Sequence, residues 1–559
     1  MASPFNIKKT TSVGRNGFDL SQRHLFGAVC GMLLPIMHEE TLPGDSFKLR
    51  LDSFTRMRPM QTAAFARFKE YFDFYFVSKD TLWPYYNAMV VNNNEPQSLP
   101  NLGTSVPQQV PCYNNMELKS WLANQTSIQY DDMDVPFDYG TTTLYDLLGC
   151  GDIQRANLGH SDMLLSLLPW AAYQRIYADF YRNPQWERRD PVSYNLRSFY
   201  NTTNQLSEFD ARANMFKIRY SNWHKDYFMG LYPTQQFGDV SVVSSPNLMV
   251  TGNLTQNVTA NVSAQPGELK NRLFANNSSF GYPAINSMMS IIDLRRAQAL
   301  QRLKEVTMTN GSSMYQQVKA HYGFELPEGR KDAPEFIGSF DNSVVINSVD
   351  AHEYSNDGST NSTSPAQQFG KASSASNIEK SIDFTAKDFG YIFCIYHVEP
   401  LLEYSALGIK RSNTKLSAAD EFIPEFDKIG FGSLQSYELL APNGGTTEVT
   451  PFTLGYSSRY LDLKASYDRI HGSFMKRDFG STDEAWAVGL GRNILTERLQ
   501  TKNLDFRFFK VDPYITNTIM QVEFNDSDIS GLLGCEPFMV AADFNIFKTS
   551  NMSVDSLPY

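Results

Sequence analysis

The stretch DSFKLRLDSFTRMR, residues 45–58, alternates apolar and charged side chains, so that Lys48 and Arg50 are interleaved with Phe47 and Leu49. Successive side chains of a β-strand point to opposite faces of a sheet. A period of two therefore predicts a strand with one buried face and one solvated face. We expect a sheet that packs on a core with one side and leaves the other in water.

A second stretch, YFDFYFV at residues 71–77, is apolar at every position except Asp73. Such a strand is typical of a sheet that is buried on both faces, as in the middle of a sandwich. Four later segments also have strand composition: 389–398, 504–511, 517–524 and 537–547. Strands at both ends of the chain predict one β-domain whose halves pair across a long insertion.

Helices are expected within that insertion. Pro169 suits the first position of a helix, where its missing N–H costs nothing, and aromatic side chains follow at spacings of three and four up to Tyr181. A second helix is predicted over 288–307 and a shorter one over 313–321. The apolar face of the second helix is expected to comprise Met288, Ile291, Ile292, Ala299, Leu303 and Val306.

Three segments have the composition of loops. Residues 92–112 are rich in Asn, Pro and Gln, residues 239–285 in Asn, Ser and Thr, and residues 355–378 are polar and of low complexity. Long loops within an ordered domain are usually functional or form interfaces. We expect these segments at the surface of the protein.

The net charge of the 559-residue chain is −11, whereas a free nucleic-acid-binding domain is usually basic. Any contact with nucleic acid must therefore be local. The first 24 residues contain several cations and one carboxylate, Asp19. They form either a DNA-binding arm or an ordinary mobile terminus, and the candidate DNA contacts are Lys8, Lys9 and Arg15.

No motif of catalysis or cofactor binding is complete. The five cysteines form no CxxC pair, and HExxH, GxSxG and GxxxxGK[ST] do not occur. Asp131, Asp132 and Asp134 suggest either a divalent-ion site or a solvated loop. We predict no catalytic residue, no cofactor and no metal. There is no basic start followed by an apolar run and no stretch of about 18 apolar residues, so neither a signal peptide nor membrane insertion is expected.

Seven segments, in this order, resemble motifs of the major capsid proteins of the Microviridae, and most closely those of the gokushovirus-like branch. The segments are 42–48, 75–83, 168–183, 291–323, 330–338, 455–460 and 537–547. Within 75–83, Ser78 departs from the family pattern, which often has Pro at that position. No single motif is specific, but seven in the same order identify the family.

The resemblance implies an eight-stranded viral jelly-roll sandwich with large loop insertions that contain a few helices. It implies a T=1 icosahedral shell of identical copies, assembled in the bacterial host cytoplasm around circular single-stranded DNA. It also implies a small basic DNA-binding protein, minor virion proteins and a host surface receptor as partners. A protrusion at the threefold axes is expected from residues 239–285, with 355–378 as the second choice.

On this basis we expect one capsid domain. Residues 1–24 would be an N-terminal arm, 25–160 the first half of the jelly roll, 161–335 a helical and loop insertion, and 336–559 the second half. Two other functions stay open: a β-sandwich that binds or acts on carbohydrate, and a bacterial surface or adhesin module. Sugar binding by a monomer would favour the first, and a signal peptide would favour the second.

Overall fold

The computed structural model describes most of the chain, in two compact units: one of residues 1–233 with 327–559, and one of residues 234–326. The described residues are 14–60, 64–91, 107, 109–124, 128, 130–153, 163–200, 204–238, 291–311, 313–327, 332–352, 367–373, 380–405, 407–441, 451–475, 483, 486–490, 504–520, 524 and 536–554.

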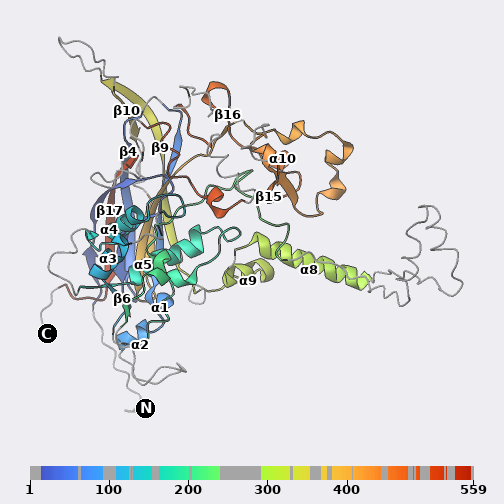
Figure 1. Cartoon of the computed structure of the whole chain (residues 1–559). Coiled ribbons are helices and arrows are strands. Elements are labelled where there is room, and N and C mark those ends of the chain that lie inside the picture. Colours follow the sequence, from blue (N-terminus) through green and yellow to red (C-terminus); the bar gives the residue numbers. More distant parts are fainter. Residues whose placement is uncertain are drawn as a thin grey trace, which may run out of the picture. The chain divides into compact units, whose positions relative to one another are not determined.

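Two five-stranded sheets form the centre of the larger unit (Figure 1). The first sheet has the order β1–β17–β4–β11, with β2 also paired to β17. Its strands are β1 (Asn16–Asp19), β2 (Gln22–Ala28), β4 (Ser46–Met57), β11 (Ile382–Thr385) and β17 (Phe538–Ser550). The second sheet has the order β10–β9–β5–β12–β3. Its strands are β3 (Leu34–Thr41), β5 (Arg67–Ser78), β9 (Glu335–His352), β10 (Gln367–Ser373) and β12 (Gly390–Pro400).

The chain passes back and forth between these sheets. It runs from β2 to β3, β4 and β5, changing sheet each time, stays in the second sheet for β9, and then alternates again through β11, β12 and β17. Eight strands with this connectivity make a jelly roll. The predicted mainly β, eight-stranded sandwich is confirmed, and β1 and β10 extend its two sheets.

Two long connections carry the remaining elements. The first joins β5 to β9 and contains α1 (Lys79–Leu82), α2 (Tyr86–Val91), β6 (Cys112–Asn114), α3 (Asn115–Ala123), α4 (Phe137–Leu147), β7 (Leu164–Ser166), α5 (Leu168–Ile176), β8 (Gln205–Leu206), α8 (Ile291–Thr309) and α9 (Met314–Tyr322). The second joins β12 to β17 and contains β13 (Tyr404–Ser405), β14 (Gly432–Gln435), β15 (Thr453–Ser457), α10 (Leu461–Lys464) and β16 (Arg469–Ile470).

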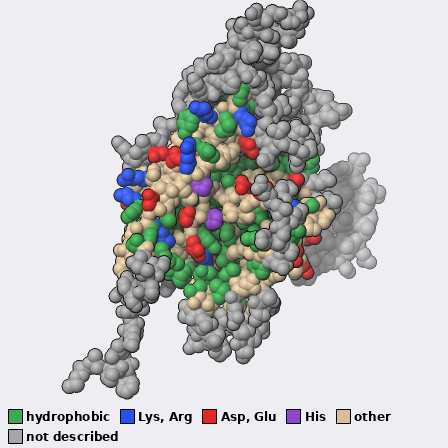
Figure 2. Space-filling model, turned by 90° about the vertical axis from the view of Figure 1, so that its left-hand side faces the viewer, with side chains coloured by type: hydrophobic (Ala, Val, Ile, Leu, Met, Phe, Trp, Pro, Cys, Tyr) green, Lys and Arg blue, Asp and Glu red, His purple; other side chains and the backbone are tan. Residues whose placement is uncertain are grey.

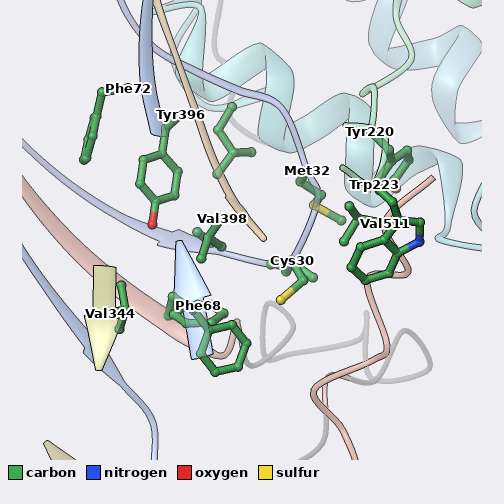
Figure 3. Packing of buried hydrophobic residues seen from close by; sticks show 14 of the residues in the cluster. Cys30, Met32, Phe68, Phe72, Tyr220, Trp223, Val344, Tyr396, Val398 and Val511 are labelled. Atoms are coloured by element: carbon green, nitrogen blue, oxygen red, sulfur yellow. The ribbon is translucent and has the colours of Figure 1, made fainter. Parts of the chain in front are cut away.

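The larger core lies between the two sheets. Phe68 and Phe72 of β5 pack there with Tyr396 and Val398 of β12, and Val344 of β9 lies beside them (Figure 3). A buried carboxylate, Glu70, crosses this core: it accepts hydrogen bonds from Thr55 at 2.5 Å and from Tyr396 and Asn342 at 3.3 Å each. Because these donors come from both sheets, Glu70 ties the sheets together.

The second sheet is also covered on its outer face. Side chains alternate along β12: Ile392 and Cys394 join the core between the sheets, whereas Phe393 and Ile395 join a second apolar cluster with α5. Every residue of β12 is consequently buried. The apolar run at 71–77 is explained in the same way, because β5 is the neighbour of β12 and is covered by the same two clusters.

The turn before β4 is fixed to the last strand of the chain. Gly44 has a φ of +89°, which an L side chain rarely adopts, and the N–H of Asp45 donates to Leu42 at 3.1 Å. The buried carboxylate of Asp45 lies 2.8 Å from Nζ of Lys548 on β17. This ion pair therefore joins residues 503 positions apart in sequence.

Most predicted elements agree with the structure. The strand expected over 45–58 is β4, that over 71–77 lies in β5, and those over 389–398 and 537–547 are β12 and β17. The helix at Pro169 is α5, which has Pro in its first turn and continues as a π-helix over Tyr177–Tyr181. The helices predicted over 288–307 and 313–321 are α8 and α9. Leu303, placed on the apolar face of α8, is 52% exposed.

Two strand predictions are wrong in their described parts. Residues 506–509 form a 3₁₀-helix, which begins where the side chain of Asp505 accepts the N–H of Phe506 at 2.6 Å. In the segment 517–524, residues 517–519 are turns and Met520 forms only an isolated bridge with Met60. The N–H groups of Ile519 and Met520 donate to the carbonyl of Thr516 at 3.0 and 3.2 Å. Both segments are apolar because they pack into the core, and burial rather than strand pairing accounts for their composition.

Other expectations fall partly or wholly outside the described residues. These are the loop at 92–112 for most of its length, the protrusion at 239–285, and the loop at 355–378 apart from part of β10. Of the expected arm, only residues 14–24 are described, and residues 16–19 and 22–24 are strand, paired to β17. The sandwich strands of the first half end at Ser78, so α1–α4, within the range 25–160, already belong to the connection.

We predict that Leu49→Ala on β4 lowers the free energy of unfolding by about 2–5 kcal/mol, because it leaves a cavity where a side chain only 1% exposed now packs. Denaturant unfolding of the full chain, followed by tryptophan fluorescence, measures this change. The matched control is Leu416→Ala, at a position 89% exposed, which should change stability by less than about 0.5 kcal/mol. Equal effects would contradict the assignment of the core.

Candidate interaction face of the sandwich

Among the described residues, the first sheet is covered on one face only. Along β4 the buried side chains alternate with Lys48, Arg50, Phe54 and Arg56, which are exposed. Figure 2 looks onto the side of the molecule where β4 and β17 lie in Figure 1, and there cationic, acidic and hydrophobic side chains are interspersed. We call the outward side of β1, β2, β4, β11 and β17 the open face.

Strand register shows which side chains are neighbours on the open face. Ala541 of β17 lies between Leu25 of β2 and Phe54 of β4, and Met539 lies opposite Arg56 in the next exposed row. Leu25 is 72% exposed, Met539 45% and Phe54 44%. The guanidinium of Arg56 lies 5.0 Å from the centre of the Phe54 ring. These residues form an apolar patch with a cation at its edge.

The other end of the open face is more polar. Phe547, 54% exposed, lies opposite Lys48, and Asn545 lies opposite Arg50. No carboxylate of the described residues forms an ion pair with Lys48, Arg50 or Arg56. In total the open face carries four cations and four carboxylates: Arg23, Lys48, Arg50, Arg56, Asp19, Asp52, Asp383 and Asp543.

The carboxylates of the open face are mostly on other strands than the cations. Only Asp52 shares β4 with Lys48, Arg50 and Arg56. Asp543 forms an ion pair with Arg23 at 3.1 Å, and Asp52 accepts a hydrogen bond from Asn545 at 3.4 Å. Among the described residues the three cations of β4 form no ion pair, but Asp383 of β11 lies directly opposite Lys48 in the strand register.

A groove of about 320 Å³ lies between β2 and β3, the free edges of the two sheets, and reaches the end of α4. His24 and His38 line it, and burial lowers the pKa of both, so their imidazoles are neutral near pH 7. Glu39 at its rim accepts a hydrogen bond from Gln22 at 2.8 Å, which links the two strands.

Buried charges hold the second long connection to the first and hold segments of the first connection together. Nζ of Lys510 donates to the hydroxyl of Tyr177 at 2.9 Å and lies 3.4 Å from the carboxylate of Glu187. Arg219, also buried, donates to Gln174 of α5 at 2.8 Å and pairs with Asp132 at 3.4 Å. Breaking a buried pair strands a charge in the interior, so this network fixes the positions of the segments that it joins.

The three aspartates considered for a divalent ion do not converge. Asp131 accepts the N–H groups of Met133 at 2.8 Å and Val135 at 3.2 Å, and burial raises its pKa to about 7. Asp132 pairs with Lys217 at 3.1 Å, and Asp134 lies 3.8 Å from Arg507. The solvated-loop interpretation holds only in part, because Asp131 is buried whereas the side chain of Asp134 is 60% exposed. Within the part of the chain that is described, no group of three or more potential ligands is placed to hold a metal.

A buried histidine bridges the middle of the second sheet. His397 of β12 lies with Nε2 3.2 Å from Asp73 and Nδ1 3.0 Å from Glu399, and its ring stacks on Tyr71 with centres 4.9 Å apart. Burial alone would lower the pKa of His397, but the two carboxylates outweigh it and raise the pKa to about 9. At this position of the second sheet, the charged His397 ring therefore interacts with the carboxylates of Asp73 and Glu399 instead of packing against apolar side chains.

The candidate DNA contacts of the N-terminus are only partly described. Lys8 and Lys9 lie outside the described residues. Arg15 donates to the carbonyl of Gly44 at 2.7 Å and to the hydroxyl of Ser46 at 3.1 Å, so its guanidinium is tied to the start of β4. From the sequence, the exposed side chains of β4 are predicted only to face solvent, and no binding role is assigned to them. Their alternation, which brings Phe54 to the same side as the cations, was the signal that could have marked them.

The described helices include none that is both long and apolar enough to cross a membrane. A jelly roll by itself is compatible with a capsid subunit or a sugar-binding domain. Comparison with known proteins distinguishes the two: a family model described as "Capsid protein (F protein)" matches residues 6–135 and 139–529. The chain belongs to this family of capsid proteins.

Individual relatives agree with the family. The chain is 21% identical over 560 residues to the capsid protein VP1 of Chlamydia phage 1, which covers 86% of this chain and 88% of the relative. It is also 21% identical over 485 residues to the capsid protein VP1 of Bdellovibrio phage phiMH2K, covering 81% of each. The resemblance to microvirus capsid proteins, inferred from seven motifs, is confirmed.

We predict that the stability of the protein falls as the pH rises from about 6.5 through about 9. The folded-state pKa of His397 lies above its ordinary value of about 6.5, so its contribution is complete below that value and is lost as the folded state deprotonates. Urea unfolding at several pH values measures the slope. His397→Gln should flatten it, whereas His471→Gln, at an exposed position, should not. An unchanged slope in His397→Gln would refute this role.

Proposed function

We propose that this chain is the major capsid protein of a small phage and that its copies assemble into a T=1 icosahedral shell around a circular single-stranded DNA genome. The observation that carries this proposal is the match of the capsid family over residues 6–135 and 139–529, which leaves little of the chain to another function. The two relatives named as capsid protein VP1 support it over most of their own length. The proposed shell makes the protein a component of the virion, assembled in the host cytoplasm.

The architecture suits such a shell. The sandwich uses its two apolar clusters for its own folding, while two long connections place many loops on the surface of the larger unit. Obligate assemblies bury about 2,000–5,000 Å² at an interface. Under closed symmetry each contact is repeated in every copy, so modest contacts add up to a stable particle. We infer a structural role without catalysis.

Because the chain is acidic, a shell of its copies requires additional positive charge to enclose DNA. A net charge of −11 per copy repels phosphate unless cations are concentrated on the inner surface or supplied by a partner. We propose a small basic DNA-binding protein as that partner, together with minor virion proteins. The N-terminal hypothesis, with Lys8, Lys9 and Arg15 as DNA contacts, stays a prediction. Because Arg15 bonds to Gly44, its removal also disturbs the turn before β4.

Particles of one size test the assembly. Electron micrographs of the expressed chain should show uniform closed shells of roughly 250–300 Å, the scale expected for T=1 symmetry with a subunit of this kind. The sedimentation of the same sample gives an independent measure of size. A stable monomer at high concentration would overturn the proposal, and sugar binding by that monomer would favour the carbohydrate-binding alternative.

Residues 239–285 are proposed to form a protrusion that binds the host receptor. They lie within the unit of residues 234–326, and none of the described strands of the two five-stranded sheets comes from that range. We expect a chain without 239–285 to assemble into shells that attach poorly to host cells, measured by particle counts on cells. Removal of 355–378 is the comparison, since that segment is the second choice. Loss of assembly on removing 239–285 would count against the proposal.

A further inference from the structure

The second long connection, between β12 and β17, carries an exposed apolar patch. Five of its large apolar side chains are exposed: Leu416 by 89%, Leu463 by 61%, Ile429 by 60%, Phe426 by 45% and Phe422 by 44%. Large apolar side chains that are exposed next to one another mark an interaction surface. We call residues 415–429 together with 459–464 the connection patch.

Contacts between the two segments show that they form one surface. The ring of Phe422 packs on the ring of Tyr460, with centres 5.0 Å apart, and the hydroxyl of Tyr460 accepts a backbone N–H of the other segment at 3.4 Å. Nζ of Lys464 lies 2.6 Å from the carboxylate of Asp427. The exposed apolar side chains beside these contacts therefore lie together.

The connection patch is held in shape by its own polar groups. Nζ of Lys415 pairs with Asp462 at 2.6 Å, although both side chains are nearly buried. Asp420 accepts the N–H of Leu416 at 3.2 Å, which fixes the turn before the 3₁₀-helix Ala418–Asp420. Tyr460 has a φ of +57°, a strained conformation that persists only where surrounding contacts hold it. A surface that is ordered in advance loses less conformational entropy when it binds.

We propose that the connection patch binds the same patch of a second copy of this chain across a twofold axis. This inference rests on the proposed function, which requires that copies bind one another, and it adds which surface meets which. The two partners of a twofold contact present identical residues, so such a surface must complement itself. An apolar centre meets that condition, because it packs on another apolar centre.

The charges of the connection patch also complement themselves. The patch has four cations and five carboxylates: Lys415, Lys428, Arg459, Lys464, Asp420, Glu421, Glu425, Asp427 and Asp462. Two ion pairs and the hydrogen bond to Asp420 engage five of these groups within the patch. The other four, two of each sign, form no ion pair with a described residue. A copy related by a twofold axis can therefore place cations against carboxylates.

The same composition favours a protein partner over a nucleic acid. A surface that binds phosphate has an excess of cations, whereas carboxylates are in slight excess here. The core of an interface between proteins is enriched in aromatic residues and depleted of charge, and its rim is polar. Phe422 and Phe426 with Leu463 fit such a core. Because the chain belongs to a family of capsid proteins, another copy of the chain is the partner present throughout the proposed shell.

Polar substitutions in the apolar centre test the contact. Leu416→Ser with Ile429→Ser changes side chains that a single chain exposes, so the melting temperature should stay unchanged. Particles should form only at about 10-fold higher protein concentration or above, because two apolar side chains no longer leave water on assembly. Sedimentation of a dilution series measures that concentration. Val192→Ser with Val554→Ser, at positions 49% and 75% exposed, is the matched control and should assemble as wild type does.

Charge substitutions test the twofold relation. Lys428→Glu changes the charge of the connection patch from −1 to −3, and Glu421→Lys with Glu425→Lys changes it to +3. Each variant alone faces its own charge across the axis, so neither should form particles at concentrations where wild type assembles. A mixture of the two variants should restore particles, because opposite charges then meet. Lys225→Glu, at an exposed position outside the patch, should assemble alone.

The mixture distinguishes a twofold contact from every other partner. If the mixture forms no particles although each variant is folded, the inference is overturned, because the connection patch then meets a different surface. Particle formation by each charge variant alone, at wild-type concentrations, would overturn it as well. So would variants that assemble normally but attach poorly to host cells, because the patch would then bind a receptor.

Failure of the proposed function has a different signature. If the wild-type chain forms no particles, the shell proposal fails, and sedimentation velocity of the full-length chain then decides the inference. A wild-type dimer that each charge variant loses and the mixture regains would support the twofold contact. A chain that stays monomeric at high concentration would overturn it.

Discussion

The structure depends on the complete burial of one strand, β12. Its side chains alternate between the core that joins the two sheets and the cluster beneath α5, so the second sheet is covered twice. Of the first sheet, the described residues cover one face, and the side chains of the other face are exposed. The division between a shielded sheet and an open sheet follows from where the insertion packs, and that in turn follows from the odd-numbered side chains of β12.

Polar groups inside this frame act as fixed points. Glu70 joins the sheets through hydroxyl and amide donors, Asp45 and Lys548 join the turn before β4 to the last strand, and Lys510 joins the second long connection to the first. An unpaired group at any of these positions would be left in a medium of low dielectric constant. They therefore specify which segments meet, although apolar burial supplies most of the stability.

Much of the fold could be predicted from the sequence where a local pattern has one explanation. The alternation around Leu49 and the unbroken apolar run at 71–77 gave β4 and β5, and Pro169 gave the start of α5. The strands predicted around Phe508 and Ile519 were wrong because an apolar residue is buried equally well in a turn or a 3₁₀-helix. The site was harder: neither the neighbours of Arg15 nor the row that joins Leu25 to Phe54 can be seen without strand register, which only the tertiary structure supplies.

The last strand of the chain occupies the middle of the first sheet. β17 pairs with β1 and β2 on one side and with β4 on the other, across nearly the full length of the polypeptide. Contacts of such sequence separation form slowly. At a translation rate of about 5–20 residues per second, roughly 25–100 s pass between the synthesis of β4 and the synthesis of β17. The first sheet of a nascent chain is therefore completed only after β17 has been synthesised.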